Sequence, residues 1–118
     1  MKSITFAVVD FFIINLIIMI ISNITYSVDK TLEQDFLEWL KAVHIPEVMM
    51  TLKPQSYKIM RLLTEIENAG ATFSVQYNFE SLMDFEDFEN EFQEDLNYEI
   101  HKRYNGHYVF FPSLLEEI

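Results

Sequence analysis

The 118-residue sequence contains no cysteine, and this absence removes several kinds of chemistry at once. Disulfide bonds, thiolate nucleophiles and zinc sites built on cysteine are all excluded. The absence fits a reducing compartment without requiring one. Glycine and proline are also scarce, with two and three copies, so the chain has little material for linkers or low-complexity segments. Gly70 and Gly106 stand far apart, which excludes a glycine-rich phosphate loop.

Basic side chains are scarce as well, because 8 Lys and Arg stand against 19 Asp and Glu and the formal net charge is −11. Such a chain repels phosphate backbones, so no nucleic-acid partner is expected. An anionic membrane surface would repel it too. Hydrophobic residues make up 50% of the chain and aromatic residues 15%. One packed domain is therefore feasible at this length.

The long apolar run from Ile4 to Ile21, preceded by Lys2, looks like a signal peptide or a membrane anchor. Asp10 lies inside it, and a charge at the centre of a membrane helix costs roughly 2.5–3.5 kcal/mol. Strand alternation starts near Met19, and residues 4–18 fall short of the roughly 20 that a span needs. We therefore expect Met19 to be the native start and residues 1–18 to be a mis-assigned extension. A signal or anchor within residues 1–22 and an extra packed element are the alternatives.

Two segments, residues 19–28 and 71–79, alternate between apolar and polar side chains as half-buried strands do. A third, residues 56–66, is apolar on both parities, which is typical of a strand buried on both faces or in an interface. Residues 67–70 read as a turn, and residues 107–111 as a last strand before a short tail.

Two segments show helical periodicity. Thr31 to Gln34 reads as a capping box, followed by the stripe Leu32, Phe36, Trp39, Leu40 and Val43. Because Ile45 precedes a proline, it is expected to be extended, with a short second helical piece over residues 46–50. Ser81 starts a long helix with an acidic, solvated outer face and the buried stripe Leu82, Phe85, Phe88, Phe92, Leu96, Ile100 and Tyr104.

The resulting order, β-α-β-β-α-β, predicts an α+β fold of the ferredoxin-like kind over residues 19–118. Two helices would cover one face of a four-stranded antiparallel sheet. The first and third strands are central in this topology. Their outward parities would place a polar stripe down the middle of the open face, made of Asn23, Thr25, Ser27, Thr72, Ser74, Gln76 and Asn78.

Four stretches of this chain resemble a family of short bacterial proteins known only as a domain of unknown function. They are residues 35–40, 44–49, 72–77 and 114–118. That family is similar to the dimeric α/β-barrel superfamily, so the resemblance implies a homodimer in which two sheets pack face to face around a cavity. Members usually begin at a methionine equivalent to Met19. Leu52-Lys53-Pro54 departs from the family, which tends to have a glycine turn there. The resemblance transfers no catalytic residues.

His44 is the best single candidate for chemistry, because an imidazole exchanges protons near neutral pH. It falls at the expected helix break, with Glu47 three residues later. A histidine that stabilises this joint is the plainer interpretation. His101 suits the helix C-terminus, where positive charge is favourable, and His107 begins a strand. No HxxxH or HxH spacing supports a metal site, and no cofactor or metal is expected.

Thr25, Thr72, Ser74, Gln76 and Asn78 could line a small-molecule pocket, although a solvent-exposed sheet face is the plainer interpretation. Glu47 is a further ligand-binding candidate. The leading hypothesis is therefore a small cytoplasmic homodimer with a ligand-binding or structural role. A cofactor-independent monooxygenase- or isomerase-like enzyme, with His44 as proton carrier, is a second. A secreted or membrane-anchored acidic binding module is a third. Fold resemblance does not choose among them.

Overall fold

The computed structural model describes residues 19–64 and 70–118. Its sheet has the strands β1 (Ile20–Val28), β2 (Pro54–Arg61), β3 (Ala71–Phe79) and β4 (Tyr108–Glu116). All neighbours are antiparallel and the order is β2-β3-β1-β4. The predicted ferredoxin-like fold is confirmed, with β1 and β3 in the centre. The expected N-terminal extension and most of the expected turn at residues 67–70 lie outside the described residues.

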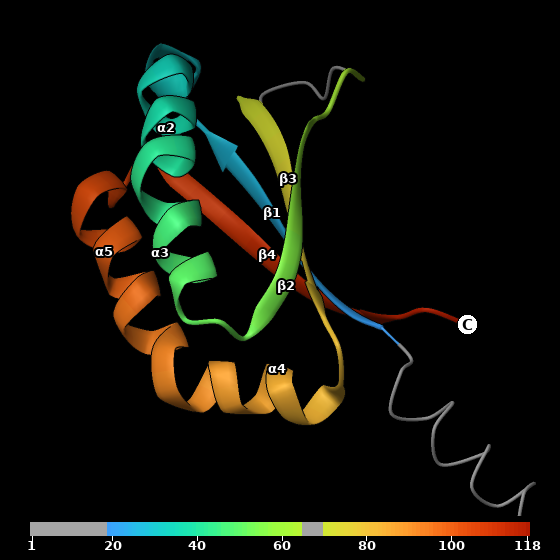
Figure 1. Cartoon of the computed structure of the whole chain (residues 1–118). Coiled ribbons are helices and arrows are strands. Elements are labelled where there is room, and N and C mark those ends of the chain that lie inside the picture. The colour runs from blue at the N-terminus through green and yellow to red at the C-terminus, as the bar shows by residue number, and fades with distance from the viewer. Residues whose placement is uncertain (1–18, 65–69) are drawn as a thin grey trace, which may run out of the picture.

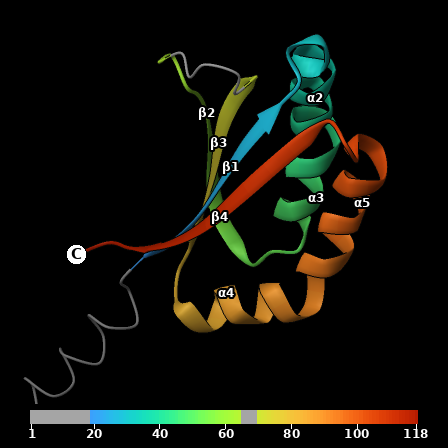
Figure 2. The ribbon, with the colours of Figure 1, turned by 180° about the vertical axis from the view of Figure 1, so that it is seen from behind.

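All described helices lie on one face of this sheet, as Figure 1 and the reverse view in Figure 2 show. The first helical run contains η1 (Lys30–Leu32), α2 (Glu33–Trp39), a π-helical turn η2 (Leu40–His44) and α3 (Ile45–Met50). The second contains α4 (Leu82–Phe88), a π-helical turn η3 (Glu89–Gln93) and α5 (Glu94–Tyr104). No described helix is both long and apolar enough to cross a membrane.

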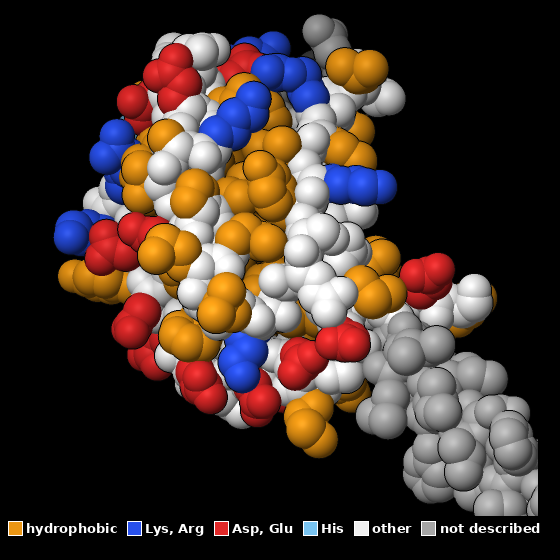
Figure 3. Space-filling view, in the orientation of Figure 1, with side chains coloured by type: hydrophobic (Ala, Val, Ile, Leu, Met, Phe, Trp, Pro, Cys, Tyr) orange, Lys and Arg blue, Asp and Glu red, His pale blue; other side chains and the backbone are white. Residues whose placement is uncertain are grey.

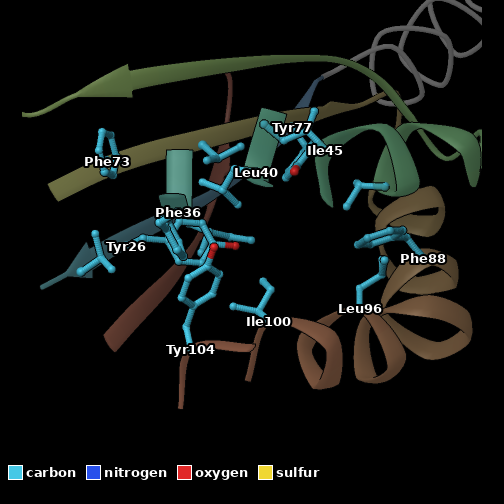
Figure 4. Close-up of a cluster of buried hydrophobic side chains, with 14 of the residues drawn as sticks. Tyr26, Phe36, Leu40, Ile45, Phe73, Tyr77, Phe88, Leu96, Ile100 and Tyr104 are labelled. Atoms are coloured by element: carbon cyan, nitrogen blue, oxygen red, sulfur yellow. The ribbon is translucent and has the colours of Figure 1, made fainter. Parts of the chain in front are cut away.

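The core lies between the helices and the inward parities of β1 and β3. Phe36 is at its centre, with Tyr26 and Tyr104 edge-on at 5.3 and 5.0 Å between ring centroids (Figure 4). The alternation predicted for both central strands is confirmed, because the buried members include Ile24, Tyr26, Val28, Phe73, Val75, Tyr77 and Phe79. Aromatic rings at these distances add edge-to-face attraction to the burial of apolar area.

The predicted capping box is wrong. Residues 30–32 form a 3₁₀ turn in which the Leu32 N–H donates to the Asp29 carbonyl at 2.9 Å. Gln34 Nε2 donates to Glu38 Oε1 at 2.8 Å instead of turning back towards Thr31. The predicted start of the second helix is confirmed, because Ser81 is its N-cap and Ser81 Oγ accepts from the Asp84 N–H at 3.1 Å.

The expected extended backbone at Ile45 is also wrong, because the residue is helical at φ −60° and ψ −45°. The Ile45 N–H donates to the Leu40 carbonyl five residues back, and this wider turn accommodates Pro46, which has no N–H of its own. The extra residue shifts the buried stripe. Val43, expected inside, is 38% exposed, whereas His44 is buried. In the second helix, Leu82 is likewise exposed rather than buried.

The observed boundaries of both edge strands, β2 and β4, differ from the predicted ones. β2 starts earlier and stops at Arg61, so Leu62 and Leu63 follow it and Ile66 lies outside the described residues. β4 continues five residues beyond the expected end and pairs with β1 throughout. Pro112 is tolerated opposite Ile24 because β4 is an edge strand, where a missing ladder donor can face solvent.

Three described residues have a left-handed backbone: Leu52, Gly70 and Gly106. Gly70 has φ +71°, and a Cβ there would lie 2.4 Å from the Val28 carbonyl oxygen, so no larger residue fits. Leu52 also has a positive φ, of 63°, and its side chain is exposed. The family resemblance placed a glycine turn at this position, and the backbone keeps the conformation that a glycine would adopt.

Candidate functional site

No described helix covers the sheet face opposite the helical layer (Figures 1 and 2). Residues that pair directly across strands share a face, so the strand register assigns its side chains to four rows. From β2 to β4 these rows are Ser56, Asn78, Ile21 and Leu115; Lys58, Gln76, Asn23 and Ser113; Met60, Ser74, Thr25 and Phe111; and Thr72, Ser27 and Val109. We call this surface the open face.

The predicted polar stripe runs down the middle of the open face and is internally hydrogen-bonded. Ser74 Oγ donates to Asn23 Oδ1, and Asn23 Nδ2 donates to Thr25 Oγ1 at 3.3 Å. Ser27 Oγ and Thr72 Oγ1 are 3.4 Å apart. Such bonds between side chains hold the hydroxyl and amide groups in fixed directions. The stripe can therefore orient a polar ligand, although it contains no group that titrates near neutral pH.

Asn78 belongs to the same stripe but bonds outward, because its Nδ2 donates to Ser56 Oγ on β2 at 2.7 Å. The structure thus brings together all the ligand-binding residues predicted from the central strands: Thr25, Thr72, Ser74, Gln76 and Asn78. Asn23 bridges two of them. The strand alternation had identified Asn23 as a member of the stripe, but only the register shows that it sits between Ser74 and Thr25.

Apolar side chains border the stripe on both sides. On the β2 side, Met60 and the following Leu62 are exposed. On the β4 side, Val109, Phe111 and Leu115 are exposed. The sequence analysis predicted only the border from the second strand, although Val109 and Phe111 lie within the predicted last strand. Its outward side chains become visible as a row only once the full pairing of β4 with β1 is known.

His44 lies on the other side of the sheet, among the helices. It is 2% exposed, and its ring stacks on Trp39 with 5.5 Å between centroids and 23° between planes. Nδ1 has no hydrogen-bond partner among the described residues. Burial lowers the pKa of His44 to about 4, because the charged imidazolium loses its hydration. His44 is therefore not part of the polar stripe. It is also not brought together with Glu47, which is exposed on α3.

Trp39 is held from the side of α5. The Arg103 guanidinium lies over its ring at 5.6 Å, and the Tyr104 ring meets it edge-on at 5.7 Å. The Tyr104 hydroxyl donates to Asp35 Oδ2 at 2.7 Å. Burial, and then this bond to Asp35, raise the pKa of Tyr104. These contacts tie α2 to α5 and fit a structural role for the cluster around His44.

The two remaining histidines are exposed. The His101 ring is 6.4 Å from Tyr108 and lines a shallow hollow along β4 with Asn105, Phe110 and Phe111. His107 Nδ1 is 2.9 Å from Asp29 Oδ2, where the ends of β1 and β4 meet. Within residues 19–64 and 70–118, no three acidic or histidine side chains come close enough to hold a metal ion.

Figure 3 shows where the charge of the helical layer lies, with acidic side chains gathered over α4 and the lower part of α5. Their placement agrees with the acidic outer face predicted for the second helix. His101, Lys102 and Arg103 occupy its last turn, where positive charge interacts favourably with the helix dipole. The acidic surface is therefore on the helical layer, away from the polar stripe.

Residues 19–118 match the family described as a domain of unknown function (DUF4286). No curated protein matches the chain. Similar solved structures include a dimeric ferredoxin-like protein from an uncultured marine organism, at 15% identity and a TM-score of 0.58, which covers 86% of this chain and 96% of its own. Another is an ethyl tert-butyl ether D (EthD) family protein from Bacillus halodurans, at 11% identity and a TM-score of 0.62, with 84% and 99% covered.

A hydroxynitrile lyase from Passiflora edulis is similar too, at 17% identity and a TM-score of 0.58, with 84% of this chain and 95% of the lyase covered. At these identities the likeness concerns the fold alone. It agrees with the ferredoxin-like architecture described above. Since one of these similar structures is a lyase and another is described only by its dimeric fold, the fold does not select a function.

Proposed function

This chain belongs to the DUF4286 family, a domain of unknown function, and we propose that it forms a homodimer whose two open faces pack together and enclose a site for a small ligand. The observation that carries the proposal is the pattern of the open face. A polar stripe with fixed hydrogen bonds runs down the centre, and exposed apolar side chains border it on both edges.

The apolar borders explain association. A contiguous exposed apolar surface on a small domain usually marks an interaction site. A two-fold contact between open faces would remove the borders from water, and a stable dimer needs at least about 1,000 Å² of buried surface. A similar solved structure described as a dimeric ferredoxin-like protein supports dimerisation itself.

The same contact would enclose the central stripe. Ligand sites are typically concave and largely apolar, with a few polar groups that set the orientation of the ligand. The hydroxyls of Thr25, Thr72 and Ser74 and the amides of Gln76 and Asn78 would be those groups. Because the stripe carries no acid or base, binding is favoured over catalysis. His44 and Glu47 lie on the helical side and are outside this site.

The unit that we propose to dimerise is residues 19–118, where the family match also lies. We propose that it acts in the cytoplasm, in keeping with the absence of cysteine. The net charge of −11 opposes association. Dimerisation should therefore tighten as added salt screens the repulsion between the two copies.

Sedimentation velocity on the full chain tests the dimer. Phe111 is 63% exposed on the open face and Tyr98 is 62% exposed on α5, so they form a matched pair. We expect Phe111→Glu to weaken dimerisation by at least about tenfold, because it places a charge at the centre of an apolar contact. Tyr98→Glu should leave the dimer unchanged. A wild-type monomer at micromolar concentration in moderate salt, or equal effects of the two variants, would overturn the proposal.

A further inference from the structure

The open face has an unusual charge composition for a chain with 19 acidic residues. Among the positions that the strand pairing assigns to it, none is Asp or Glu. One is charged, and it is Lys58 on β2, directly opposite Gln76 on β3. The face that would be enclosed in the dimer is therefore locally positive, although the protein as a whole is strongly negative.

No carboxylate of the described residues pairs with Lys58. Lys53, Arg61, Lys102 and Arg103 each have a carboxylate within 4 Å among the described residues. The Lys58 ammonium makes no ion pair or hydrogen bond with a described residue, and the side-chain amide of Gln76, its partner across the strands, makes no hydrogen bond with one either. The ammonium group and the amide therefore lie side by side on the open face, and their N–H groups can donate hydrogen bonds to a ligand.

The surroundings of Lys58 differ along the strand. Towards Met60, the next row contains Ser74, Thr25 and the exposed Phe111. In the other direction the row is polar at Ser56 and Asn78, which bond to each other. A ligand whose head lies at Lys58 would thus have hydroxyl groups and apolar side chains on one side of it.

Dimerisation would also change the electrostatic environment of Lys58. Two copies facing each other would bring two such ammonium groups towards one enclosed space that holds no carboxylate of the open faces. Like charges that lose water repel strongly, and an anion between them would offset both the repulsion and the loss of hydration. Charge-assisted hydrogen bonds from an ammonium to a carboxylate are among the stronger polar contacts in proteins.

We propose that the ligand of this protein is an amphipathic anion. Its carboxylate- or sulfonate-like head would be held by Lys58 and Gln76, and its apolar body would lie against Met60 and Phe111. This inference rests on the proposed function, because it requires that the open faces enclose the site. It adds the charge and the shape class of the ligand, neither of which follows from dimerisation.

The test uses the full chain and two probes with the same naphthyl body, 1-naphthoate with an anionic carboxylate head and 1-naphthamide with a neutral amide head. Isothermal titration calorimetry should show 1-naphthoate binding at least about tenfold more tightly than the amide. Lys58→Gln should abolish that preference, while Lys58→Arg should keep it. Lys41→Gln, which removes an exposed lysine of the helical layer, is the matched control and should also keep it.

Sedimentation of the same samples separates the two proposals. If the wild type is a dimer but binds neither probe, binds both equally, or keeps its preference in Lys58→Gln, the anion inference is overturned and the dimer is not. Lys58 would then serve only as a charge that protects an edge strand. If the wild type is a monomer, the proposed function fails first and the anion inference with it.

Discussion

Replacing His44 with phenylalanine should change how the stability of this protein depends on pH. The imidazole is almost fully buried against Trp39, and its Nδ1 has no partner among the described residues. Burial lowers its pKa from 6.5 to about 4. Phenylalanine keeps a flat ring at this position and removes both the titration and the unsatisfied nitrogen, which itself costs about 1–3 kcal/mol when buried.

The sign and size of this pH-dependent change in unfolding free energy follow from proton linkage. Between pH 6.5 and about 4 the unfolded chain binds a proton at His44 and the folded chain does not, so acid favours unfolding. The contribution of neutral His44 is therefore intact above pH 6.5 and is lost progressively as the pH falls towards 4. A shift of one pKa unit corresponds to about 1.4 kcal/mol, so the full loss is about 3 kcal/mol, of which about 2 kcal/mol is reached at pH 5.

Urea denaturation at pH 7 and pH 5 measures this loss, and the single tryptophan, Trp39, reports unfolding by fluorescence. Carboxylates titrate in the wild type and the variant alike, so the difference between them isolates His44. We expect the drop in unfolding free energy between the two pH values to be about 2 kcal/mol smaller in His44→Phe. An equal drop in His44→Phe and the wild type would refute the reasoning.

Two further predictions concern the core and one turn. Phe36→Ala should lower the unfolding free energy by about 3–5 kcal/mol, because it empties the centre of the aromatic core. Leu82→Ala, on the exposed start of α4, should change it by less than about 1 kcal/mol, and equal effects in urea denaturation would contradict the assigned helix faces. Leu52→Gly should raise the melting temperature slightly, since relief of a left-handed backbone at φ 63°, about 1–2 kcal/mol, exceeds the added freedom of the unfolded chain. A lower melting temperature in this variant would show that the Leu52 side chain stabilises the turn.

The alternation of apolar and polar residues gave the most reliable structural prediction. Tyr26 and Phe73 lie on the buried parity that the pattern predicted, and Thr25 and Ser74 lie on the open one. A period of two is a property of the backbone itself, so it needs no knowledge of the neighbouring strands. The polar stripe could be predicted for this reason, although the bonds within it could not.

The buried face of the first helical run was predicted less well, because that run contains a π-helical turn. In the second run the prediction is confirmed beyond the π-helical turn, where Leu96, Ile100 and Tyr104 are buried. In the first run, one extra residue within the turn rotates the residues that follow. Val43 is therefore outside and His44 inside, contrary to a regular period of 3.6 residues. The length of β4 was missed for a related reason. Pro112 reads as the end of a strand, and it is compatible with a strand only because β4 lies at the edge of the sheet.

The sequence by itself determined the order of elements, the parity of the two central strands and the balance of charge, because these depend on local periodicity and composition. Only the tertiary structure decided which side chains share a surface. It placed Lys58 beside Gln76 on a face whose paired positions include no acidic residue, and it placed His44 on the opposite side of the sheet. Register and helix rotation decide such neighbours, and both are set by how distant segments pack together, which no local pattern records.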